Sequence, residues 1–144
     1  MSPTDEPHAD EVEEIMELVI RYAYLYDQSR YDEASELFTE TGKLDTGELG
    51  NGTHTGRGEI RALMQSGAGP GSIHCMVNHV VDQIAGMDAE GSVYSVSETL
   101  TTDGAVLGRT VLITDQYALT SDGWRFKRRG VSRVLASSSD EEHR

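Results

Sequence analysis

A chain of 144 residues is long enough for one domain with a buried core and an internal cavity, and two domains would be difficult to fit. Its 25 acidic and 12 basic residues give a formal charge of -13, which disfavours nucleic acid and membranes as partners. The single cysteine, Cys75, excludes an internal disulfide, and no apolar run approaches the roughly 20 residues of a membrane span. The N-terminus lacks the basic start and apolar middle of a secretory signal, so we expect a cytoplasmic protein whose ligand is neutral or weakly polar.

Both ends of the chain have the composition of flexible tails. Residues 1–8 and 137–144 are polar and acidic, and they cannot bury enough apolar surface to offset the entropy lost on ordering. No internal repeat or linker interrupts the rest of the sequence. We therefore expect one domain over residues 9–136, between a flexible N-terminus and a flexible acidic C-terminus.

The first half of the chain has the periodicity of helices. From residue 9 to about residue 29, apolar side chains recur at the spacing of one helix face, namely Val12, Ile15, Met16, Val19, Ala23 and Tyr26. A short helix is predicted over about residues 31–38. Another, over about residues 58–65, follows the turn HTGRG.

The second half of the chain is typical of β-strands. Four segments are rich in Val, Ile, Thr and Tyr, and the turn sequences AGMDAEG, TTDG and TSDG separate them. They are residues 72–85, 91–101, 105–120 and 123–136. Helices followed by an antiparallel meander predict an α+β domain in which the helices cover one face of a curved sheet. A cavity would lie between the two layers.

Asp27 stands where the apolar stripe of the first helix should continue. On a wheel of about 100° per residue, Tyr22 and Asp27 lie at opposite edges of the inward-facing arc. A carboxylate in that place is costly unless a partner neutralises it. Alternatively, Asp27 points to solvent in the last helical turn. The helix dipole disfavours a carboxylate near the C-terminus, so helix stability does not explain its placement.

His74 is the candidate partner of Asp27. In SIHCMVNHVV, strand alternation puts His74 and Asn78 on one face and His79 on the other. Both faces are partly apolar, so we expect one histidine to face the cavity and the other a subunit interface. A histidine in a strand is commonly structural, but a buried aspartate would hold one imidazole nitrogen protonated and leave the other as a base.

Other kinds of chemistry have weaker support. The chain has no G-x-S-x-G motif, which would supply a nucleophilic serine. Cys75 would lie on the strand face opposite to that of His74, so acyl-enzyme chemistry is not expected. Of the five histidines, two lie in the expected tails and none forms a helical H-x-x-x-H pair, so we expect no metal and no cofactor.

The last strand, WRFKRRGVSRV, is basic. Such a strand is usually solvated or ion-paired, but an arginine that entered the cavity would stabilise an anion.

Together these segments resemble the SnoaL-like branch of the NTF2-like superfamily over nearly the whole expected domain. The resemblance lies in YDQSRYDEASELFTETGKLD, HTGRGEIRALM, IHCMVNHVV and DGWRFKRRGVSRV. The most similar members are the lyases scytalone dehydratase, bile-acid 7-alpha-dehydratase and gamma-hexachlorocyclohexane dehydrochlorinase. The resemblance implies a cone-shaped α+β fold, a deep pocket under the sheet and a homo-oligomer, a trimer or a dimer.

The resemblance also assigns site residues. The helix aspartate of the lyases matches Asp27, and their histidine in an I-H-x-x-x-N context matches His74. The position five before the aspartate matches Tyr22, and the arginine five residues after the last-strand tryptophan matches Arg129. The second histidine of scytalone dehydratase has no counterpart in GSVYSVSETL.

The resulting hypothesis is a cofactor-independent lyase, a dehydratase of a hydrophobic hydroxylated ring or polyketide-like compound. His74 would remove a proton and Asp27 would orient it, while Tyr22 assists the departing hydroxyl and Arg129 stabilises negative charge. The alternatives are an isomerase or cyclase of the same fold and a non-catalytic small-molecule-binding domain. The expected pocket wall comprises Tyr26, Phe38, Leu63, Met64, Met76, Asn78, Val96 and Leu112.

Overall fold

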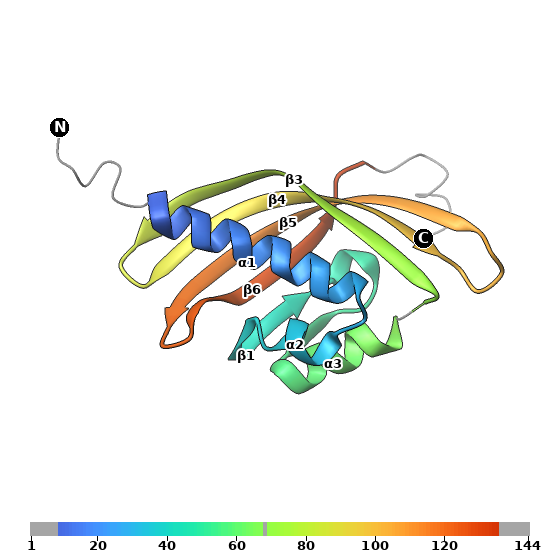
Figure 1. Cartoon of the computed structure of the whole chain (residues 1–144), viewed down its shortest axis with the longest axis horizontal. Coiled ribbons are helices and arrows are strands. Elements are labelled where there is room, and N and C mark those ends of the chain that lie inside the picture. The colour runs from blue at the N-terminus through green and yellow to red at the C-terminus, as the bar shows by residue number, and fades with distance from the viewer. Residues whose placement is uncertain (1–8, 68, 136–144) are drawn as a thin grey trace.

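The computed structural model describes residues 9–67 and 69–135, and the two expected tails lie outside the described residues (Figure 1). The helical elements are α1 (Ala9–Asp27), α2 (Tyr31–Ser35), the short 3-10 helix η2 (Gly47–Leu49) and α3 (Arg57–Ser66). The strands are β1 (Phe38–Asp45), β2 (Thr53–Thr55), β3 (Gly71–Ala85), β4 (Asp88–Leu100), β5 (Val106–Thr120) and β6 (Gly123–Arg133). Within these ranges, no helix is long and apolar enough to cross a membrane.

The six strands form one curved sheet in the order β2-β1-β6-β5-β4-β3. Strands β3 to β6 form the expected antiparallel meander, and α1 lies across one face of it (Figure 1). Two further strands extend the sheet, because β1 pairs in parallel with β6 and β2 pairs antiparallel with β1. The predicted α+β class, with helices on one face of a curved sheet, is confirmed, but the sheet is larger and mixed.

The sequence pattern does not predict strand β1, and only its first residue, Phe38, falls in the expected second helix. The pairing of the strand explains the difference. Its sequence, FTETGKLD, has no clean alternation, and the register with β6 shifts between Phe38 and Lys43. Gly42 lies at this irregularity. A Cβ there would come within 3.0 Å of Phe38 Cβ and 3.1 Å of the Phe126 carbonyl oxygen, so glycine permits the close approach.

The hydrophobic core lies between α1 and the central strands. Ile15 and Val19 of α1 are fully buried, as the helical spacing predicts. An aromatic cluster continues the core, with Phe38 and Phe126 ring centroids 5.2 Å apart. Its packing anchors the middle of α1 on the sheet, which leaves the C-terminal turns of the helix to face a cavity.

A β-bulge at Asn78 divides strand β3 into two halves. Asn78 has a φ of 53°, and the register with β4 shifts between Val77 and Val80. Asparagine is among the few residues that adopt this left-handed conformation readily. The bulge inserts one residue and reverses the alternation, so His74 and His79 are both partly buried on the helix side, while Asn78 is exposed. The prediction that the two histidines face opposite sides is therefore wrong.

Candidate active site

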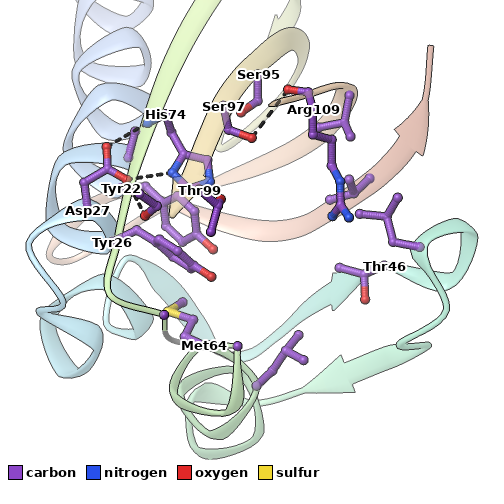
Figure 2. A pocket seen from close by; sticks show the side chains of 18 of the residues that line it. Tyr22, Tyr26, Asp27, Thr46, Met64, His74, Ser95, Ser97, Thr99 and Arg109 are labelled. Carbon is purple, nitrogen blue, oxygen red and sulfur yellow. Dashed lines mark hydrogen bonds and ion pairs between the residues drawn. The ribbon is translucent and has the colours of Figure 1, made fainter. Parts of the chain in front are cut away.

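A cavity of about 650 Å³ lies between the C-terminal half of α1, the helix α3 and the concave face of the sheet. Strand pairing arranges its floor in transverse rows, because paired residues of antiparallel strands point to the same face. The rows are Ser72, Thr99 and Leu107; His74, Ser97 and Arg109; and Met76, Ser95 and Val111. Figure 2 shows that side chains from helix and sheet converge on this space.

Asp27 reaches this cavity because α1 ends there. Ser29 has a φ of 59°, and the Arg30 amide donates a hydrogen bond to the Leu25 carbonyl, which closes the helix C-terminus. The chain then turns away, so the last side chain of the helix lies against strand β3. Asp27 therefore does not point to solvent, which removes the alternative interpretation of its position.

Three donors from strand β3 bind the Asp27 carboxylate. His74 Nδ1 lies 2.6 Å from Oδ1, and the His74 backbone amide donates to Oδ2 at 2.8 Å. The Ser72 hydroxyl donates to Oδ1 at 3.1 Å. Backbone and side chain of His74 are thus held by the two oxygens of one carboxylate, which fixes the imidazole in place (Figure 2).

The geometry selects one tautomer of His74. A carboxylate only accepts hydrogen bonds, so Nδ1 carries the proton that it shares with Asp27. Nε2 then holds the lone pair. Among the described residues nothing is hydrogen-bonded to Nε2, and His74 lines the cavity. The Tyr26 ring packs edge-on against the imidazole, with centroids 5.0 Å apart, and restrains its rotation.

Two tyrosine hydroxyls enter the same space. Figure 2 shows Tyr22 and Tyr26 below His74, with their hydroxyls directed into the cavity. Burial raises the pKa of both phenols, and for Tyr22 the charge of Arg129 lowers the pKa by a smaller amount. Both phenols are therefore protonated at neutral pH and act as hydrogen-bond donors.

Arg129 lies behind the cavity wall. Its Nε and Nη2 bind the two oxygens of Asp115 at 2.7 and 3.0 Å, and both side chains are almost completely buried, at 1% and 0% exposure. The guanidinium carbon is 4.8 Å from the Tyr22 ring centroid. The prediction that Arg129 itself stabilises charge in the cavity needs correction, because Asp115 holds the guanidinium and Tyr22 lies between it and the cavity.

The Asp115 carboxylate continues this network away from the cavity. It accepts a hydrogen bond from the Tyr117 hydroxyl at 3.1 Å, and that hydroxyl lies 3.1 Å from His79 Nε2. Burial lowers the pKa of His79, in spite of the opposing effect of Asp115. His79 is thus a structural histidine on the inner side of the sheet, next to the buried ion pair.

The predicted pocket wall divides into two groups. The side chains that line the cavity are Tyr26, Leu63, Met64 and Met76. The others do not line it, and they are Phe38, Asn78, Val96 and Leu112. Phe38 is fully buried in the core, and Asn78 is exposed at the bulge. Val96 and Leu112 are one residue out of phase, since their neighbours Ser95 and Val111 occupy the inward positions.

The sequence pattern missed the polar part of the wall. Every second residue of β4 from Ser95 to Thr99 lines the cavity, namely Ser95, Ser97 and Thr99. Thr46 and Arg109 also line it (Figure 2). The alternation in GSVYSVSETL contains this signal, but the prediction of an apolar wall placed Val96 in it. In the part of the chain that the structure describes, no three His, Cys, Asp or Glu side chains gather in a group able to hold a metal ion.

Comparison with known proteins identifies the family of the chain. A family model described as the SnoaL-like domain matches residues 7–130. None of the curated proteins compared with the chain matches it.

Among solved structures, the chain is similar to an NTF2-like protein with a cystatin-like fold from Novosphingobium aromaticivorans, at 26% identity over 93% of this chain and 88% of that one, with a TM-score of 0.74. It also resembles a candidate scytalone dehydratase from the same organism, at 20% identity over 92% and 89% of the two chains, with a TM-score of 0.82. A protein of unknown function from Mycobacterium tuberculosis is 21% identical over 98% and 81%, with a TM-score of 0.84. The family model covers most of the chain, and these neighbours share its fold: the chain belongs to the family of SnoaL-like domains.

Proposed function

We propose that this SnoaL-like domain is a cofactor-independent lyase that dehydrates a hydrophobic hydroxylated ring or polyketide-like compound. The observation that supports the proposal is the 2.6 Å contact between His74 Nδ1 and Asp27 Oδ1, which leaves Nε2 as an oriented base facing the cavity. Family membership is consistent with it, and so is the fold that the chain shares with the candidate scytalone dehydratase.

In the proposed reaction His74 Nε2 takes a proton from the carbon next to the one that bears the hydroxyl group. The electron pair of that carbon–hydrogen bond forms the new carbon–carbon double bond, and the carbon–oxygen bond breaks. The departing hydroxide takes the phenolic proton of Tyr22 and leaves as water. The imidazolium of His74 returns its proton to the phenolate of Tyr22 through that water. Asp27 stabilises the imidazolium as long as it carries the additional proton.

Arg129 acts in this mechanism through Tyr22. Its guanidinium lies 4.8 Å from the centre of the phenol ring, in a position where water does not screen the interaction. The positive charge favours the phenolate and so lowers the pKa of Tyr22, which burial alone would raise further. Tyr22 is in this way a better proton donor than an isolated buried phenol. Arg129 is thus a positioning and tuning residue.

Mass spectrometry of incubations with a panel of hydroxylated one-, two- and three-ring compounds tests the reaction class. We expect at least one compound to give a product lighter by one water. A product of unchanged mass but altered chromatographic retention would show an isomerase or cyclase and contradict dehydration. Compounds that bind and are recovered unchanged across the panel would instead favour a binding domain.

We also infer that the chain forms a homo-oligomer through the outer face of β3 and β4. Ile73, Val77 and Val80 on β3 are exposed, and so is Val96 on β4. Neighbouring apolar side chains on an open sheet face are typical of an interface between proteins. A second copy of the chain would cover this face and bury them.

Replacing both Ile73 and Val96 with glutamate should dissociate the assembly, because charges would be buried in the interface. Light scattering coupled to size-exclusion chromatography should give a multiple of 15.8 kDa for the wild type, a trimer or a dimer, and the monomer mass for the variant. Met87→Glu, which adds a charge at the exposed β3–β4 turn, is the control and should leave the assembly intact. A monomeric wild type would contradict the inference.

A further inference from the structure

Arg109 is the cation of the cavity wall, and the mechanism above does not use it. We propose that Arg109 binds a carboxylate of the substrate, so that the preferred ligand is a hydroxylated ring acid. This inference rests on the proposed function, because it takes the cavity to be the substrate site. It names the class of substrate and the residue that selects it.

The strand register places Arg109 in the same row as His74. His74 pairs with Ser97 on β4, and Ser97 pairs with Arg109 on β5. Two strand spacings separate the Cα atoms of His74 and Arg109, a distance of about 10 Å. The two side chains therefore stand at opposite ends of one row across the floor of the cavity, which is the span of a small ring system with a substituent.

The side chain of Arg109 is directed into the cavity. Figure 2 shows its guanidinium descending from β5 toward the space that the hydroxyls of Tyr22 and Tyr26 enter from the other side. The positive charge of Arg109 opposes the effect of burial on the pKa of Tyr26, which agrees with the two groups facing a common space. A ligand held there would contact all three side chains.

Within the described part of the chain, the guanidinium of Arg109 has neither an ion pair nor a hydrogen bond. Four other arginines differ, because carboxylates bind the guanidinium groups of Arg30, Arg61, Arg128 and Arg129. The carboxylate in the cavity wall is Asp27, and strand β3 already supplies three donors to it. The planar, bidentate donor group of Arg109 is thus available to a ligand, and a carboxylate is the group that matches its geometry.

The position of Arg109 indicates a role in recognition, separate from the bond that breaks. The base and the proposed acid, His74 and Tyr22, lie on the α1 side of the cavity, so Arg109 would hold the far end of the ligand. Between them, Ser95 and Ser97 line the cavity. The chain carries a charge of -13, but salt screens distant charges beyond about 8 Å, so the nearest cation dominates inside the cavity.

Isothermal titration calorimetry with matched acids and amides tests this inference. The probes are pairs such as 6-hydroxy-2-naphthoic acid and 6-hydroxy-2-naphthamide, with one- and three-ring pairs beside them. The His74→Gln protein serves as the parent, so that no probe is consumed. We expect the parent to bind the best acid about 10- to 100-fold more tightly than its amide, the range given by one charge-assisted hydrogen-bond pair.

Adding Arg109→Gln to the parent should abolish the preference for the acid, while Arg109→Lys should keep part of it. Arg21→Gln is the matched control, because Arg21 is exposed, as Arg109 is, but lies on α1 outside the cavity wall. Equal affinity for acid and amide across the panel would overturn the inference, and so would a preference that persists in Arg109→Gln. Binding is measured without turnover, so the absence of dehydration would overturn the proposed reaction alone.

Discussion

His74→Gln should lower kcat for a substrate found in the water-loss screen by about 10²- to 10⁴-fold, which is the usual contribution of a positioned acid or base. Glutamine can still donate a hydrogen bond to Asp27, but its amide cannot take a proton from carbon. Asp27 would keep two further donors, the backbone amide of residue 74 and the Ser72 hydroxyl. The variant should therefore unfold within a few degrees of the wild type, as measured by circular dichroism.

Ser72→Ala provides the matched control for this prediction. It removes a 3.1 Å hydrogen bond to the same carboxylate oxygen but leaves the base and its 2.6 Å contact in place. We expect its kcat to fall by less than about tenfold, since the backbone amide and the imidazole of His74 still bind the Asp27 carboxylate and the base keeps its orientation. If His74→Gln kept a kcat close to that of Ser72→Ala, His74 would not be the base and the proposed mechanism would be wrong.

Arg129→Met should destabilise the fold by about 3–5 kcal/mol, the usual cost of breaking a buried ion pair from one side. The change would leave the Asp115 carboxylate, which is 0% exposed, with the Tyr117 hydroxyl as its remaining side-chain donor. Methionine fills a similar volume, so lost packing contributes little. The free energy of unfolding from urea denaturation measures the effect.

A double-mutant cycle separates the ion pair from the packing around it. Arg129→Met combined with Asp115→Leu removes both charges, so the double variant should recover a large part of the stability that Arg129→Met loses. Arg128→Met is the control on the neighbouring residue. Its ion pair with Asp45 is partly exposed, so the loss should be about 1 kcal/mol or less. Equal losses in Arg129→Met and Arg128→Met would contradict the importance of burial.

The sequence predicted those elements whose signal is local. The helical stripe defined α1 to within two residues at its end, and the alternating apolar strands with Asp-Gly turns defined the meander. Strands β1 and β2 were missed, because FTETGKLD owes its conformation to parallel pairing with β6, far along the chain. Pairing of that kind leaves little trace in the composition of the strand itself.

The candidate site shows the same division between local and non-local information. Asp27 stood out because a carboxylate interrupted an apolar stripe, and its contact with His74 followed from the need for a partner and from the family resemblance. The pocket wall was less predictable. Alternation divides the residues of a strand between two faces but does not say which face points inward. The prediction placed Val96 on the inward face of β4, whereas the structure has Ser95 there. Arg109 was not predicted, because the predicted wall consisted mainly of apolar side chains.

The bulge at Asn78 has a consequence for engineering the cavity. Because one inserted residue separates the alternation of residues 71–77 from that of residues 79–81, the side chains before and after the bulge face different parts of the molecule. Ser72 and Met76 border the ligand space, whereas His79 belongs to the network of the buried ion pair. The cavity can thus be resized by substitutions in the first half of the strand with little effect on the packing that the second half maintains.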